Sequence, residues 1–281
     1  MALANLLPTV KLGRYDVTRL IIGGNPFRGY SHWREHMDRE MTAWHTAGHI
    51  ADALCDAEAA GINTMQMRGD RYIFDAVAEY RRRGGTMHWI CQTASEQPDI
   101  LQNIRTIAAL QPIAIYHHGT NTDQHFKAGT MDVVRQRVEL IKELGLLAGV
   151  ASHLPEVHEW IVERGWPVDF HMCCVYNLSR EPRESKIVSG GGWVNEDWLF
   201  QEEDPPKMYR FVRQVDRPCL VFKVLAAYRK CQTQETVRAA LEHAYANIKP
   251  TDAIIVGMWH KHMNQAALNA RHVRQILNGE G

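Results

Sequence analysis

The chain has 281 residues, of which 45% are hydrophobic and 23% charged, and its 32 Lys and Arg balance 32 Asp and Glu. This composition is typical of a globular protein and excludes collagen-like, coiled-coil and wholly disordered chains. A net charge of zero gives no general attraction to nucleic acid, which binds to clustered basic residues. We therefore expect a small-molecule partner and no nucleic-acid partner.

The sequence also indicates where the protein works. No stretch reaches the ~18–20 consecutive apolar residues that span a bilayer, and the first eight residues lack the basic flank of a signal peptide. The six cysteines form no CxxC pair, which is typical of reduced thiols. We expect a cytoplasmic protein with no membrane partner; the sequence leaves its oligomeric state open.

Short apolar runs alternate with helical patterns along the chain. The runs are nearly continuous in apolar residues, as expected for strands with both faces covered. The predicted strands are residues 19–24, 62–67, 87–92, 113–118, 147–151, 168–174, 219–224 and 253–257. Apolar residues at helical spacing predict helices at residues 46–60, 72–83, 100–110, 131–144, 156–164, 206–215, 234–248 and 264–277.

Residues at the ends of these helices support the assignment. Glycine favours the left-handed conformation that ends many helices, and Thr is a good N-terminal cap. Thr130 and Thr233 stand where helices are predicted to begin. A glycine follows four of the predicted helices, at Gly61, Gly84, Gly145 and Gly165.

Eight strand–helix units without a break in composition predict one domain over residues 1–281, an α/β fold of the (β/α)8 TIM-barrel type. A doubly wound open sheet is the alternative, but it normally carries a GxGxxG turn after its first strand. Here that turn reads Gly23-Gly24-Asn25-Pro26-Phe27. Two long segments, residues 25–44 and 179–205, follow the first and sixth strands, and we expect the second to be a lid.

Six segments, in this order, resemble the aldo/keto reductase family along nearly the whole chain. The first looks like the N-terminal hairpin of the family, and the others look like regions in or beside five of its barrel strands. The segments are KLGRYDVTRL at residues 11–20, AAGIN at 59–63, GVASH at 149–153, VYNL at 175–178, FKVLA at 222–226 and IIVGM at 254–258. The resemblance implies the same barrel, with the N-terminal hairpin.

The catalytic residues of the family are mostly missing. Its reductases use Asp, Tyr, Lys and His around a substrate carbonyl, where Tyr supplies the proton. The Asp position holds Gln66, and the Lys position holds Gln92 or Thr93. The Tyr position falls at Arg71 or Tyr72. The His is kept as His118, so the resemblance implies His118 and Tyr72 as catalytic candidates, in a divergent member of the family.

The cofactor pattern of the family is weakened as well. NADP is bound in the family through polar groups after the fifth and sixth strands and a cation after the eighth. Ser152 and Lys261 stand at such positions, and they are the cofactor-binding residues expected if NAD(P) is used. His153, next to Ser152, is a further catalytic candidate that can move a proton.

Histidines and a cysteine gather at the predicted catalytic ends of the strands. His171 and Cys173 are two residues apart in a strand and share a face, while His118 and His153 end adjacent strands. These four side chains suggest a divalent Zn, Fe or Mn site. Acidic and amide groups can complete or orient its ligands, among them Gln66, Asp70, Asp123 and Glu181. Separate hydrogen-bonded histidines are the alternative.

The same barrel end holds candidate substrate-binding residues. Charged and amide groups can bind hydroxyl or carboxylate groups, and tryptophans suit a sugar or aryl ring. The candidates are Asn25, Gln66, Arg68, Asp70, Trp193, Trp198 and Lys223. A salt-bridged rim with packed tryptophans is the alternative.

Three functions remain open. The first is a non-redox enzyme for a small carbonyl or carbohydrate-type substrate, a lyase or an epimerase that uses acid–base chemistry, with or without a metal. The second is an NAD(P)H-dependent carbonyl reductase with a rearranged site. The third is a catalytically inactive barrel used as a binding subunit.

Overall fold

The computed structural model describes residues 5–181 and 197–279. Eight parallel strands close into a barrel in the order β10-β3-β4-β5-β6-β7-β8-β9. Their bounds are β3 Leu20–Gly23, β4 Thr64–Arg68, β5 His88–Gln92, β6 Ala114–His117, β7 Leu147–Ser152, β8 Phe170–Cys174, β9 Cys219–Phe222 and β10 Ala253–Gly257. The predicted (β/α)8 barrel is confirmed.

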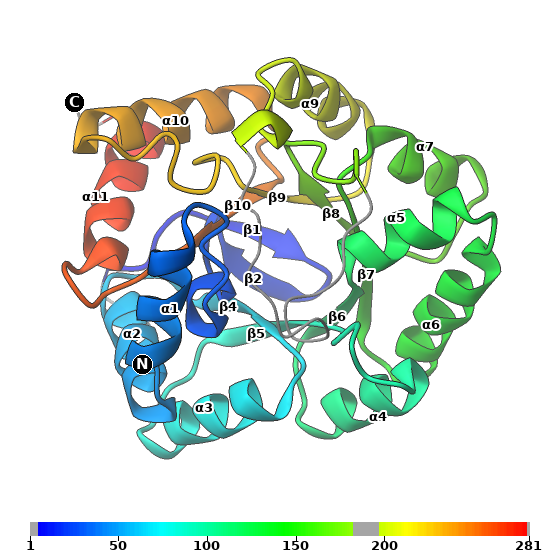
Figure 1. The fold of residues 1–281 in the computed structure, drawn as a ribbon, viewed down its shortest axis with the longest axis horizontal. Coiled ribbons are helices and arrows are strands. Elements are labelled where there is room, and N and C mark those ends of the chain that lie inside the picture. Colours follow the sequence, from blue (N-terminus) through cyan, green and yellow to red (C-terminus); the bar gives the residue numbers. More distant parts are fainter. Residues whose placement is uncertain (1–4, 182–196, 280–281) are drawn as a thin grey trace.

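Helices form a ring around the strands (Figure 1). The eight predicted helices are present as α2 Ala47–Ala59, α3 Arg71–Arg82, α4 Ile100–Ala109, α6 Met131–Glu143, α7 Pro155–Glu163, α9 Asp204–Gln214, α10 Gln234–Asn247 and α11 Gln265–Asn278. Two more helices, α1 (Glu35–Trp44) and α5 (Gly119–Lys127), and two 3-10 turns, η1 (Asn25–Arg28) and η2 (Asp197–Leu199), lie in the connections after strands. The sequence did not predict these four.

Alternation along the strands separates the barrel interior from its outer wall. Inward side chains such as Ile90, Phe170 and Leu220 form one buried cluster, and outward ones pack against the helices in a second. The N-terminal hairpin, β1 (Thr9–Leu12) and β2 (Tyr15–Thr18), adds Val10, Leu12 and Val17 to the interior cluster. The hairpin therefore covers the end of the interior cluster opposite the carboxyl ends of the strands.

The helix ends follow the predicted capping residues with one exception. Gly61, Gly84, Gly145 and Gly165 all have positive φ angles, and Thr233 forms a reciprocal capping box with Thr236. Thr130 is the N-cap residue of α6, as predicted, but its side chain makes no capping hydrogen bond. The Thr130 hydroxyl instead bonds to Nδ1 of His125 at 2.8 Å, which removes it from the helix N-terminus.

The connection after β8 is described only in part. Most of the segment predicted as a lid, including Trp193, lies outside the described residues. Across the described ranges, no helix combines the length and apolar composition that a membrane crossing requires. None of the six cysteines forms a disulfide.

Candidate active site

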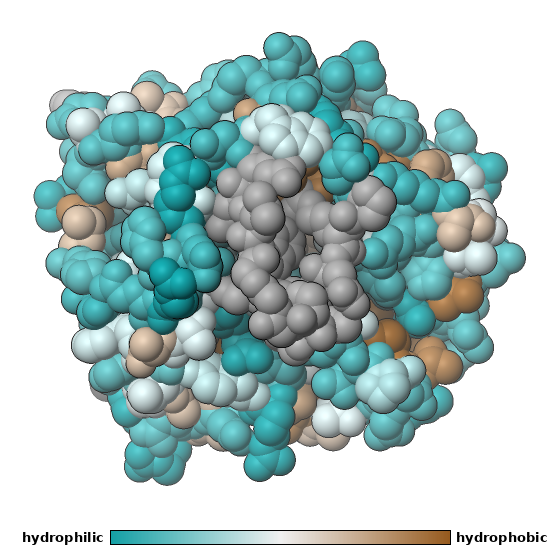
Figure 2. All heavy atoms as spheres, in the orientation of Figure 1, coloured by the Kyte–Doolittle hydropathy of each residue, from teal (hydrophilic) through white to brown (hydrophobic). Residues whose placement is uncertain are grey.

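A cavity of about 350 Å³ opens at the carboxyl ends of the strands. In TIM barrels this end carries the active site, because the connections after the strands meet there. His118, His153, Asn25, Gln66, Arg68 and Lys223 all line it, as the sequence predicted for this end of the barrel. Figure 2 looks onto this end, and the described residues around its centre are mostly hydrophilic.

A buried Asp–His pair stands in the wall of this cavity. His153 follows β7, and its Nδ1 lies 2.7 Å from Oδ2 of Asp123 in α5. Asp123 is 1% exposed and His153 is 8% exposed. Burial alone would raise the pKa of Asp123, but bonds from His153, Ser152 and Ser179 outweigh it and lower that pKa. The carboxylate is therefore ionised and holds the proton of His153 on Nδ1.

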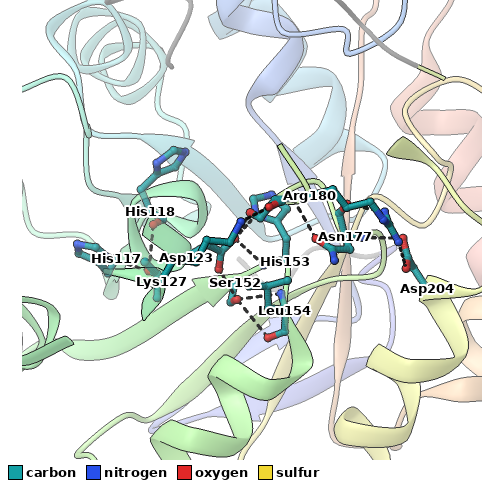
Figure 3. Close-up of polar contacts among 12 residues, drawn as sticks. His117, His118, Asp123, Lys127, Ser152, His153, Leu154, Asn177, Arg180 and Asp204 are labelled. Carbon is teal, nitrogen blue, oxygen red and sulfur yellow. Dashed lines mark hydrogen bonds and ion pairs between the residues drawn. The ribbon is translucent and has the colours of Figure 1, made fainter. Parts of the chain in front are cut away.

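Hydrogen bonds from the end of β7 and from the connection after β8 hold Asp123 in place. Ser152 donates to Oδ1 (Figure 3), and Ser179, in the connection after β8, donates to Oδ2. Asn177 and Arg180 anchor that connection to Asp204 at the start of α9. The carboxylate is thus fixed by groups from the two strand–helix units that follow α5, which limits how far His153 can turn.

His118 is a neutral imidazole at the same cavity. It is the N-cap residue of α5, and its backbone N–H donates to Oγ1 of Thr93 at 3.1 Å. Burial, and to a smaller extent the nearby charges of Arg68 and His153, lower its pKa to about 3. A neutral His118 can offer one N–H donor to a substrate oxygen at neutral pH without carrying charge.

Tyr116 and Gln92 form part of the inner wall. Tyr116 precedes His118 by two residues, and its hydroxyl lies 2.8 Å from Oε1 of Gln92. Both residues line the cavity together with Gln66. Burial raises the pKa of Tyr116 well above its usual range, although Arg68 opposes the shift. Tyr116 is therefore a hydrogen-bond donor here rather than a phenolate base.

Tyr72 does not join this group. Its hydroxyl donates to the backbone carbonyl of His45, and its ring packs under Arg28 at 4.7 Å. Tyr72 is not among the cavity-lining residues, and burial raises its pKa. The expectation that Tyr72 supplies a proton here was wrong, because α3 begins at Arg71 and directs this side chain toward His45 at the end of α1.

The predicted four-ligand metal group does not form. His171 and Cys173 share a face of β8, as expected, but that face is the outer wall of the barrel. His171 contacts His158 of α7, with 3.1 Å between their Nδ1 atoms, and Phe211 of α9. Within residues 5–181 and 197–279, no three His, Cys, Asp or Glu side chains are arranged to hold a metal. The donor set therefore does not fit the proposed zinc-type site, which needs at least three protein ligands.

A charged cluster stands at the end of β4. Asp70 caps α3, and its Oδ2 lies 3.2 Å from Nε of Arg28 and 3.3 Å from Nε of Arg68. Arg68 also contacts Glu96. Only the two arginines of this cluster line the cavity, so Asp70, predicted to bind substrate, lies behind them.

Trp198 and Lys223 differ in their relation to the cavity. Trp198 lies in η2, is 45% exposed and is not a lining residue. Lys223 follows β9 and has a positive φ of 65°. It lines both the cavity and a second, adjoining one of about 590 Å³, which extends between the connections after β9 and β10.

The second cavity offers little positive charge for the phosphates of NADP. Its lining is largely apolar, and among described residues Lys223 is its only Lys or Arg. Lys261 is 2.6 Å from Glu40 and is not in the lining. Ser152 is fully buried, donates to Asp123 and accepts from the Leu154 N–H. The two residues expected to bind NAD(P) are thus engaged elsewhere, while a dinucleotide phosphate needs several donors and cations.

Two functional residues went unrecognised in the sequence. Tyr116 is two residues from Ala114 in β6, so the two side chains share a face of the strand. Because Ala114 faces inward, this spacing would have placed Tyr116 in the barrel interior. Asp123 was considered only as a residue that might support a metal site. Its role as the partner of His153 was hidden because α5 is a short polar segment, GTNTDQHFK, without an apolar period.

No family model and no curated protein matches this sequence. Among solved structures, an aldo/keto reductase from Brucella melitensis has a TM-score of 0.54 at 12% identity and covers 97% of this chain and 92% of its own. The glycerol dehydrogenase from Gluconobacter oxydans has a TM-score of 0.53 at 9% identity, with 95% of each chain covered.

Other barrel enzymes are similarly close. A truncated 3-deoxy-D-arabino-heptulosonate 7-phosphate synthase from Thermotoga maritima has a TM-score of 0.53 at 11% identity and covers 98% of this chain and 92% of its own. At these identities a likeness defines the fold and leaves the chemistry open. The structural neighbours of this (β/α)8 barrel therefore include aldo/keto reductases, as the sequence resemblance implied.

Proposed function

We propose that this protein is an enzyme that moves a proton at a carbon next to a substrate carbonyl, as an epimerase or a lyase. The single observation that carries the proposal is the bond of 2.7 Å between Asp123 and Nδ1 of His153 at the wall of the cavity. An ionised carboxylate that holds one imidazole nitrogen as N–H makes the other nitrogen basic and orients it. This arrangement is typical of a general base.

The neighbouring groups support the second half of the reaction. When Nε2 of His153 takes the proton from carbon, the electron pair moves to the carbonyl oxygen as an enolate. The N–H of neutral His118 is a donor for that oxygen, and the hydroxyl of Tyr116 becomes a second donor when it turns from Oε1 of Gln92. Epimerisation results when the planar enolate turns in the site and protonated His153 returns the proton to its opposite face. Elimination results when protonated His153 gives the proton to a departing β-hydroxyl group, which leaves as water.

A carbonyl reductase is the second candidate, since the barrel resembles those of aldo/keto reductases and a second cavity adjoins the first. It needs a bound nicotinamide and a proton donor beside it. The high pKa of Tyr116 and the engaged Ser152 and Lys261 oppose it. A binding subunit without activity is the third candidate, and it has no need of an oriented histidine.

The test is proton exchange with solvent. Wild-type protein is incubated in D₂O with a panel of small 2-oxo acids, 2-hydroxy aldehydes and ketoses, and loss of the carbon-bound proton is followed by NMR. We expect exchange with at least one compound, abolished in His153→Asn and retained in His36→Asn, which changes an exposed histidine. Tight NADPH binding without any exchange would instead support the reductase.

A further inference from the structure

The charge distribution of the cavity is one-sided. Arg28, Arg68 and Lys223 line it, and no Asp or Glu of the described chain does. The carboxylates that balance the two arginines, Asp70 and Glu96, are not lining residues. A ligand in the cavity therefore meets the two guanidinium groups directly, with their counterions on the far side.

Arg68 is the best-placed of these cations. It is only 9% exposed, and burial lowers its pKa, so the folded chain carries a desolvated charge here. Its Nε and Nη2 pair with the carboxylates of Asp70 and Glu96, which do not line the cavity. A guanidinium has five N–H donors in a planar fork, so Arg68 keeps further donors for an anionic ligand on its cavity side.

Arg68 also lies near the reacting groups. Its charge acts on both His118 and Tyr116, the two donors assigned to the carbonyl oxygen. In the closed strand order, β4 and β6 are separated only by β5, so Arg68 and His118 end strands on the same side of the barrel. An anionic group at Arg68 would thus stand next to the carbonyl at His118.

On the basis of the proposed function, we propose that the substrate is a small anion whose carboxylate or phosphate group binds Arg68, with Lys223 adding positive charge at the mouth. A carboxylate attached directly to the reacting carbon and a phosphate ester one or two carbons away share this chemistry. The cavity of about 350 Å³ suits a compact molecule of this kind.

The test uses probes of matched shape. Oxalate, oxamide and inorganic phosphate are titrated into wild-type protein, and binding is followed through the ring resonances of His118 and His153. We expect oxalate or phosphate to shift both rings and neutral oxamide to leave them unmoved. Oxalate binding alone indicates a carboxylate, and phosphate binding alone indicates a phosphate ester. Equal binding of oxamide and oxalate, or no binding of either anion, would overturn the proposal.

Variants locate the site. Arg68→Gln should weaken binding of the anion at least about tenfold, since a charged hydrogen bond is lost. Arg71→Gln, which changes an exposed arginine at the start of α3, should leave binding unchanged. If Arg68→Gln does not fold, Lys223→Gln is the second variant. It should weaken binding of the anion and make that binding less sensitive to salt than in wild type. Equal weakening by Arg71→Gln, or none in any variant, contradicts the assignment.

These results separate the two proposals. His153→Asn should still bind the anion while it loses proton exchange. Exchange with neutral compounds only, together with no anion binding, would remove the anionic substrate and leave the acid–base enzyme standing.

Discussion

Asp123 and His153 come from different strand–helix units, yet the carboxylate and the imidazole are 2.7 Å apart and both are buried. Asp123 lies in the middle of α5, and His153 is the first residue after β7. The pair exists because α5 packs beside β7. His118 is the N-cap residue of α5, and Asp123, about one helical turn further on, faces Ser152 at the end of β7. The same helix thus positions both histidines of the cavity.

Asp123→Asn should leave the fold intact and reduce the rate of proton exchange by roughly 10²–10⁴-fold. The amide can donate to Nδ1 and so favours the wrong tautomer of His153. The measurement is the exchange rate at saturating substrate for Asp123→Asn, with Asp132→Asn as the control on the exposed face of α6. A loss of less than about threefold in Asp123→Asn would remove the pair from the mechanism.

His118 should stay neutral across the physiological range. Its pKa is lowered to about 3, so its ring carbon resonances should not move between pH 5 and pH 8. An added imidazole in the same sample serves as the reference that does titrate. A titration midpoint near pH 6.5 for the ring resonances of His118 would show that this imidazole can carry charge. His118 would then act as an acid rather than as a neutral donor.

The buried pair His158 and His171 should make the fold sensitive to acid. Burial lowers the pKa of His158 to about 4 and that of His171 well below its usual value. As pH falls below ~6.5, the unfolded chain takes up protons that the folded chain resists, so the free energy of unfolding decreases. For His158 alone the loss should be about 2 kcal/mol at pH 5.

Urea unfolding at pH 7.5 and pH 5 measures this loss. His158→Gln should be less stable at pH 7.5, but its free energy of unfolding should change less between the two pH values. If wild type and His158→Gln lose the same amount of stability, the buried imidazole is not the source of the acid sensitivity.

The turn after β9 contains three consecutive residues with positive φ, Ala226, Ala227 and Tyr228. Side chains other than glycine disfavour this region by roughly 1–2 kcal/mol each. Arg229 holds the turn through bonds to the His32 carbonyl and Asp197. Ala227→Gly should therefore raise the melting temperature by roughly 2–4 °C, whereas Ala239→Gly, on the exposed face of α10, should lower it.

The fold was predictable because its signals are repeated. Each of the eight strands was visible as an apolar run, and each end lies within about two residues of the structure. α5 was missed because its exposed face and its buried Gly119, Thr122 and Asp123 are all polar or small, so no apolar period marks it. α1 was missed for a related reason, since only Asp38 and Met41 of it are buried.

The site was harder to predict because it depends on tertiary placement. The parity rule correctly put His171 and Cys173 on one face of β8, but it does not say which face points inward. Phe170 and Met172 fill the interior instead, so His171 points outward to the helix layer. The partner of His153 comes from a segment thirty residues away, so no local spacing could have revealed it.

The most direct test of the account is proton exchange by protein that carries no cofactor. The protein is unfolded and refolded in the presence of a chelator, and its content of metal and of nicotinamide cofactor is confirmed to be negligible. Proton exchange is then measured with the compound that exchanged in the D₂O screen. The account predicts that exchange persists at the original rate and is lost in Asp123→Asn. Exchange that returns only when NADP(H) or a divalent metal is added would contradict it.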